Sequence, residues 1–162
     1  LNAWSIYPIF WTGSVAIERS TLNSLQPCFP PGEKHGEDQD LWFRLAEIGP
    51  ITFKYITTTS FYRKGVINSL TAESVLKPLP AFTRLALRAH KFKRLNKEAA
   101  LGLCNLHIMH VAWNNCMLGN KIAAFYYLFQ VSIGKYSIYW LRIFLFSLLP
   151  SFVSRTLLKL LK

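Results

Sequence analysis

The stretch HGEDQDLWFRLAEIGP, residues 35–50, places a run of carboxylates just ahead of an apolar segment that stops at Gly-Pro. The apolar side chains of this segment recur at the spacing of one helical face: Leu41, Leu45 and Ile48. This i, i+4, i+7 spacing predicts a helix that begins at Asp38. Gly49 and Pro50 supply the stop expected at the C-terminal end of a helix.

The three acids at the start of this helix, Glu37, Asp38 and Asp40, admit three interpretations. In the first interpretation they only cap the helix, because acids in the first turn face the positive end of the helix dipole. The Asp-x-Asp spacing also suits a divalent metal on a nucleotide diphosphate, with His35 as a third ligand, although no second His or Cys lies at metal-ligand spacing. One acceptor is enough for a cap, however, and the preceding Pro/Gly-rich loop, residues 26–36, is typical of the wall of a site. The cluster is therefore a candidate functional site.

The segments around this helix read as parts of a sheet. Residues 14–18, SVAIE, predict a short strand, and residues 19–25 begin a helical turn with Ser20 or Thr21 as its N-cap. Residues 51–56 alternate apolar and polar side chains and predict a half-buried strand, and residues 58–63 form a second β-prone run. The fold class expected for this half is α/β, the C-terminal half of a mixed sheet.

Residues 77–80, KPLP, predict a linker, beyond which every segment has a helical pattern. We expect helices over residues 81–95, 98–118, 121–133 and 136–149, and one more after Pro150. Gly119 and Asn120 suit a left-handed cap between the second and third of these helices. Two domains are therefore predicted, an α/β half over residues 1–76 and an all-helical extension over residues 77–162.

The net charge of +11 is concentrated in the second half of the chain. Residues 1–76 carry six Lys/Arg against seven Asp/Glu, whereas residues 77–162 carry thirteen against one. Such a basic, aromatic-rich half suits nucleic acid or a membrane. Its aromatic residues lie inside apolar runs rather than on a polar surface, which disfavours nucleic acid. The longest of these runs, near residues 138–149, is too short to span a bilayer.

The end of the chain has the pattern of an amphipathic helix. Its basic residues lie on one side: Arg155, Lys159 and Lys162. Its apolar residues lie on the other: Val153, Leu157, Leu160 and Leu161. This pattern favours docking on an anionic membrane surface. The alternative is that these helices pack on another part of the protein.

The remaining candidate ligands point to structural roles. The three cysteines, Cys28, Cys104 and Cys116, have no CxxC spacing and favour buried thiols in a reducing compartment. His107 and His110 lie one helical turn apart, a spacing that can bind a metal. Since no carboxylate lies nearby to complete a metal shell, a polar stripe on a partly buried helix is the favoured interpretation.

A family resemblance joins several of these motifs. The run GSVAIERSTL, followed by GEDQDLWFRLAEIGPITFKYITTTSFYR, closely resembles the second half of family 2 glycosyltransferases with the GT-A fold. The resemblance covers residues 10–69, in which four motifs agree in order and approximate spacing. It implies inverting transfer of a sugar from a nucleotide diphosphate sugar to a saccharide or lipid-linked acceptor, in cell-envelope polysaccharide biosynthesis.

The resemblance also implies roles for particular side chains. Asp38 would be the general base that removes the proton of the acceptor hydroxyl. The implied substrate-binding residues are Glu37, Asp40, Arg44, Gly13, Ser14, Arg63 and Lys64. Of these, Glu37 would orient the acceptor, and Asp40 with Arg44 would tie the helix start to neighbouring loops. Arg63 and Lys64 would steady the diphosphate, with plain surface solvation as the alternative.

The same resemblance implies that much of the enzyme lies elsewhere. The chain begins at Leu1 rather than Met, so we expect it to be a piece of a longer protein. The nucleotide-binding half and the ligands of a Mg²⁺ or Mn²⁺ ion would lie upstream, and this piece alone would be inactive. Gly65 stands where many members carry a metal-binding His. The expected location is the cytoplasm, peripheral to the inner face of the cell membrane. The competing hypothesis is a non-enzymatic helical module that docks on a membrane or a partner.

Overall fold

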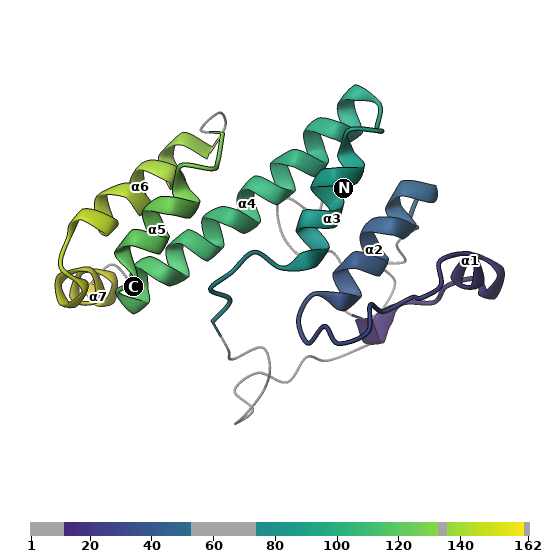
Figure 1. Ribbon diagram of the computed structural model, residues 1–162, viewed down its shortest axis with the longest axis horizontal. Coiled ribbons are helices and arrows are strands. Elements are labelled where there is room, and N and C mark those ends of the chain that lie inside the picture. The colour runs from purple at the N-terminus through teal and green to yellow at the C-terminus, as the bar shows by residue number, and fades with distance from the viewer. Residues whose placement is uncertain (1–11, 53–73, 133–135, 161–162) are drawn as a thin grey trace. The chain divides into compact units, whose positions relative to one another are not determined.

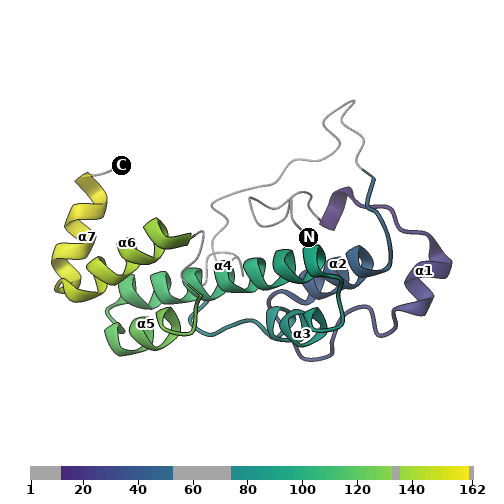
Figure 2. The same ribbon diagram turned by 90° about the horizontal axis from the view of Figure 1, so that it is seen from above.

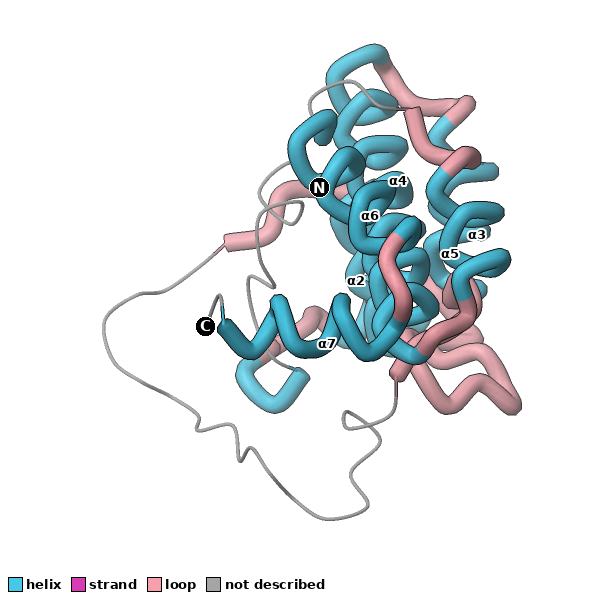
Figure 3. The backbone as a smooth tube through the Cα atoms, turned by 90° about the vertical axis from the view of Figure 1, so that its left-hand side faces the viewer, coloured by secondary structure: helices cyan, strands magenta, loops and turns pink. Residues whose placement is uncertain are grey.

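The computed structural model describes residues 12–52, 74–132 and 136–160 (Figure 1). Throughout these ranges the chain forms helices joined by loops, and no strand occurs in them (Figure 3). The described residues divide into two compact units. Unit 1 falls within residues 1–73 and 79–103, and unit 2 within residues 74–78 and 104–162.

Unit 1 contains α1 (Arg19–Ser24), α2 (Glu37–Ile48), α3 (Pro80–Ala89) and the first part of α4 (Arg94–Leu118). Helices α2 and α3 lie side by side (Figure 2). The ring of Phe43 meets that of Phe82 edge-on, with 5.2 Å between their centroids. Phe43 and Leu85 are fully buried, so the core of unit 1 lies between these two helices.

Unit 2 contains the second part of α4, α5 (Lys121–Leu128), α6 (Ser137–Leu148) and α7 (Ser151–Leu160). Its core joins Met109 of α4, Leu128 of α5 and Ile143 of α6, each fully buried. Between α4 and α5, Gly119 has a φ of 93°, which confirms the left-handed cap predicted there.

Residues 74–78 belong to unit 2 because two asparagines of α4 hold them. Asn114 donates from Nδ2 to the carbonyl oxygen of Val75 at 3.0 Å. Asn115 donates to the carbonyl oxygen of Leu76 at 2.9 Å and to that of Val111 at 2.9 Å. Asn115 is buried, so its amide satisfies backbone carbonyls that would otherwise lose their contact with water.

The predicted α/β fold class is wrong for the described residues. Residues 15–18, the body of the first predicted strand, run without a ladder partner. Half-buried Val15 and Ile17 alternate with exposed Ala16 and Glu18, and the two half-buried side chains pack against the cluster around Leu41 of α2. Any extended segment that lies on an apolar surface alternates in this way. The pattern therefore predicted correctly which side chains are half-buried, but it did not indicate a sheet. The second and third predicted strands fall largely or wholly within residues 53–73, outside the described residues.

The predicted helices occur, with corrected ends. The helix from Asp38 begins one residue earlier, at Glu37, and ends before Gly49 as predicted. Ser20 and Thr21 both lie inside α1 instead of capping it, since the N-cap position is Glu18. The Ser20 hydroxyl donates to the carboxylate of Glu18 at 2.6 Å. Helices α3 and α5 stop short of residues 95 and 133, since tight turns follow Ala89 and Leu128.

Candidate functional site

The acidic cluster begins at a glycine whose conformation the fold requires. Gly36, the N-cap of α2, has a φ of 74°. A Cβ atom at this position would lie 3.0 Å from Cδ1 of Leu79. The positive φ strains any residue with a side chain, and the Leu79 side chain would also have to shift to make room. Gly36 therefore offers no capping side chain, and the acids of the first turn, Glu37, Asp38 and Asp40, stand at the positive end of the helix.

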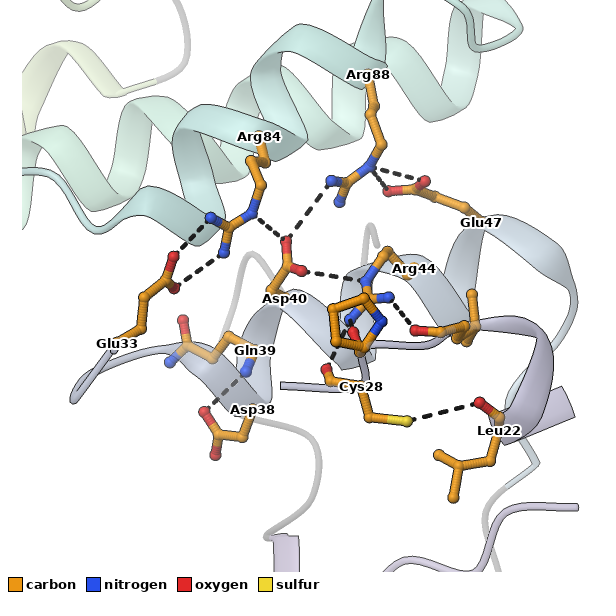
Figure 4. A network of polar contacts seen from close by, with 12 residues as sticks. Leu22, Cys28, Glu33, Asp38, Gln39, Asp40, Arg44, Glu47, Arg84 and Arg88 are labelled. Carbon is orange, nitrogen blue, oxygen red and sulfur yellow. Dashed lines mark hydrogen bonds and ion pairs between the residues drawn. The ribbon is translucent and has the colours of Figure 1, made fainter. Parts of the chain in front are cut away.

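Asp40 is the centre of an ion-pair network between α2 and α3 (Figure 4). Asp40 is buried, with 3% of its surface exposed. One carboxylate oxygen lies 3.0 Å from Nε of Arg84 and 3.6 Å from Nη1 of Arg88, and the other lies 3.1 Å from Nε of Arg44. A carboxylate buried among three guanidinium groups is held by protein cations, which leaves it no open side for a ligand.

Two further carboxylates complete the network. Arg84 donates two hydrogen bonds to Glu33, at 2.6 and 2.9 Å. Arg88 donates from Nε to Glu47, at 2.9 and 3.0 Å. Burial raises the pKa of Glu47, and the hydrogen bond from Arg88 opposes that rise. The hydrogen bond to Glu33 raises the pKa of Arg84. Three acids thus meet three arginines, and the network clamps α2 to α3.

Arg44 joins the Pro-rich loop to the same network. Its guanidinium donates to the carbonyl oxygen of Leu25 at 2.5 Å, to that of Pro27 at 3.1 Å and to that of Cys28 at 2.6 Å. These bonds are charge-assisted, which makes them stronger than neutral ones, and those to Leu25 and Cys28 are also partly sheltered from water. Asp40 and Arg44 therefore connect the helix start to the loop that precedes it.

The carboxylates of Asp38 and Asp40 point to different sides of α2 (Figure 4). Asp38 is partly exposed, and its Oδ1 accepts a hydrogen bond from the backbone N–H of Gln39 at 2.7 Å. No group of three His, Cys, Asp or Glu residues suited to a metal ion occurs in the described part of the chain. Gly13 and Ser14 end the 3-10 turn η2 (Thr12–Ser14), and Arg63 with Lys64 lies outside the described residues. The catalytic role of Asp38 stays a prediction.

The comparisons with known proteins were negative. No known family matches this chain: no family model, no curated protein and no solved structure does so. The predicted membership of the family 2 glycosyltransferases is therefore corrected, since no match supports it and no strand of a GT-A sheet occurs in the described residues. The GEDQDLWFR motif that suggested the family serves, in large part, the clamp between α2 and α3.

Unit 2 carries a second candidate site, which the sequence patterns did not reveal. Large apolar side chains of α5 and of its C-cap residue are exposed at i, i+4, i+7 spacing: Ile122, Tyr126 and Phe129. Those of α6 follow a similar spacing: Ile138, Leu141, Leu145 and Leu148. We call these two sets the apolar stripes. Each lies on the side of its helix opposite the buried residues, which are Ala124 and Leu128 in α5 and Ile143 and Ser147 in α6. The sequence did contain a signal for the stripes. In α5 and α6 apolar residues recur at helical spacing on a second face, in addition to the face that is buried.

The basic side chains of unit 2 face no acidic ones within the unit. Residues 74–78 and 104–162 contain seven Lys/Arg and no Asp/Glu. Lys121 serves the fold, because its Nζ donates to the carbonyl oxygen of Phe146, in the last turn of α6, at 3.0 Å. Among the described residues, no helix has both the length and the apolar character that crossing a bilayer demands.

His107 and His110 occupy adjacent turns of α4, and burial governs their charge. Burial lowers the pKa of His107 to about 4, with a further contribution from the nearby His110. Burial also lowers the pKa of His110, whose ring meets that of Tyr139 edge-on at 6.0 Å. The pair therefore stays neutral near pH 7.

Acidification is expected to destabilise unit 2 through His107. A folded-state pKa below the ordinary 6.5 means that the unfolded chain binds the proton more tightly, so stability is lost as the pH falls from 6.5 toward about 4. At about 1.4 kcal/mol per pH unit, the loss by pH 5 is about 2 kcal/mol. Urea unfolding at pH 7.5 and pH 5 measures it, with His107→Gln as the comparison. The prediction is wrong if the variant loses as much stability on acidification as the parent does.

Proposed function

We propose that this protein docks peripherally on a membrane surface through unit 2. The observation that carries the proposal is the pair of apolar stripes on α5 and α6. Ile122 and Ile138 are 88% and 85% exposed, and Phe152 of α7 is exposed as well. Large apolar side chains gathered on neighbouring helices are uncommon on the free surface of a soluble domain and mark an interaction site.

The composition of unit 2 favours lipid over a protein partner as the occupant. Its seven Lys/Arg and lack of Asp/Glu give it a single sign of charge, which complements an anionic leaflet. The first stripe combines Ile122 with the rings of Tyr126 and Phe129, and the stripe of α6 is aliphatic throughout. Aliphatic and aromatic side chains on one face are typical of helices that lie in the plane of an interface. Burying a Leu, Ile or Phe side chain fully contributes roughly 1.5–3 kcal/mol. Several such side chains, even partly inserted, give useful affinity.

Unit 1 offers no comparable surface among its described residues. Its exposed large apolar side chains are single ones on separate elements: Phe29, Ile48 and Leu87. Single exposed apolar residues are normal on any protein surface. Glycosyl transfer with Asp38 as the general base stays a prediction. In the part of the chain that the structure describes, no group of three possible metal ligands supports it.

Vesicle co-sedimentation tests the docking proposal. The full chain should bind vesicles of phosphatidylglycerol mixed with phosphatidylcholine. Ile122→Ser together with Ile138→Ser should weaken binding at least ~10-fold, because two side chains that would enter the interface become polar. Both positions are highly exposed in the free protein, so the helical circular dichroism and the melting temperature should not change.

A matched variant separates docking from general hydrophobicity. Ile48→Ser together with Leu87→Ser removes two exposed apolar residues from unit 1 and should leave vesicle binding unchanged. If both double variants lost vesicle affinity equally, the stripes would not be the surface that binds the membrane. A parent chain that does not sediment with vesicles of any composition would exclude membrane docking and favour a protein partner.

A further inference from the structure

Arg142 of α6 differs from Arg44, Arg84 and Arg88 of unit 1 in having no carboxylate partner among the described residues. Arg44, Arg84 and Arg88 each pair with at least one acid. Among the described residues, the Arg142 guanidinium contacts aromatic rings. No Asp or Glu exists anywhere in the sequence of unit 2, so no residue of that unit can neutralise it.

Two rings hold the Arg142 guanidinium in place. Its Cζ lies 5.3 Å from the ring centroid of Trp113 on α4 and 5.8 Å from that of Phe146 on α6. The two rings are themselves packed together, with 5.4 Å between their centroids. Cation–π contacts engage the plane of the guanidinium, while its N–H donors lie in that plane and stay available for hydrogen bonds. Arg142 is thus oriented in advance, which lowers the entropic cost of binding an acceptor.

The position of Arg142 relates it to the apolar stripe of α6. Ile138 lies four residues before it and Leu145 three residues after it, and residues at these spacings are neighbours on a helix surface. An exposed guanidinium beside exposed aliphatic side chains matches a molecule with an anionic head and an apolar body. The planar fork of arginine suits phosphate oxygens in particular.

We propose that Arg142, held by Trp113 and Phe146, binds the phosphate of an anionic phospholipid headgroup and gives unit 2 its preference for anionic membranes. This inference rests on the proposed docking function. The acyl chains of the same lipid layer would meet Leu141 and Leu145 of the apolar stripe. The aromatic residues around the guanidinium match the interfacial zone, where amphipathic rings accumulate.

The experiment compares three single variants of the full chain on two kinds of vesicle, pure phosphatidylcholine and its mixture with phosphatidylglycerol. Arg142→Gln should lose ~30-fold or more of its affinity for the mixed vesicles, because charge-assisted hydrogen bonds are lost together with the charge. Arg142→Lys should still lose ~10-fold, since an ammonium keeps the charge but not the fork. Lys77→Gln, at an exposed residue of unit 2, removes the same charge elsewhere and should cost at most ~5-fold.

The outcomes distinguish this inference from the function on which it rests. If the parent binds both vesicle types and Arg142→Gln loses no more than Lys77→Gln, docking stands and the headgroup site is excluded. If the parent binds no vesicles, the proposed function itself fails. A further arm adds millimolar inorganic phosphate at matched ionic strength. Unchanged binding supports a lipid phosphate, whereas loss of the anionic preference would show that free phosphate is the ligand and would overturn the proposal.

Discussion

Asp40→Asn is expected to lower the free energy of unfolding of unit 1 by about 3–5 kcal/mol, the range measured when one partner of a buried ion pair is removed. The amide keeps the size of the side chain but removes its charge. Arg44, Arg84 and Arg88 would then converge on a neutral group, and the amide nitrogen would face a guanidinium. The loss should be seen in urea unfolding followed by far-ultraviolet circular dichroism.

A neighbouring acid provides the control for Asp40. Glu37→Gln removes a negative charge from the same first turn of α2, where the helix dipole contributes only about 0.3–1 kcal/mol. Equal small effects in the two variants would contradict the clamp and would mean that Asp40 acts only through the dipole. A large effect at Asp40 alone places its role in joining α2 to α3.

Ile143→Ala is expected to destabilise unit 2 by about 2–5 kcal/mol, because it opens a cavity in a fully buried position. Ile143 of α6 lies in the core with Met109 and Leu128. The surrounding helices can collapse only partly into the space left by the lost methyl groups. Differential scanning calorimetry at neutral pH should therefore show a lower melting temperature for this variant.

Leu145→Ala, two residues further along the same helix, is the matched comparison. Leu145 is 51% exposed, so its loss should change stability by no more than about 0.5 kcal/mol. It belongs to the apolar stripe, and the variant should bind vesicles more weakly while unfolding like the parent. If Leu145→Ala destabilised the protein as much as Ile143→Ala, the stripe would be part of the core.

The helices were predictable from the sequence because their signals are local. The apolar spacing after Asp38, the Gly-Pro stop and the left-handed turn at Gly119 each depend on residues within one or two turns. The strand at residues 14–18 was not, because an extended segment becomes a strand only when another segment pairs with it. Val15 and Ile17 have the alternation of a strand but find a helix as their neighbour.

The fate of the acidic cluster depended on contacts far along the chain. Arg84 and Arg88 follow Asp40 by more than forty residues, and no local pattern assigns them to it. Their spacing in the sequence places Arg84 and Arg88 on one helical face, but it does not indicate that this face packs against α2. In unit 2 the opposite difficulty arose, since α5 and α6 are apolar on several sides and only packing separates the buried side from the stripes.

The path of the chain between the units limits how this protein could be rebuilt from parts. The backbone passes from unit 1 into unit 2 at residues 74–78, returns to unit 1 for α3, and enters unit 2 again inside α4. No single break at the KPLP segment can therefore yield two self-sufficient halves. A recombination event there would remove from unit 2 the backbone segment that Asn114 and Asn115 bind. It would also separate the arginines of α3 from Asp40 of α2. Only a segment that spans both units would keep these contacts intact.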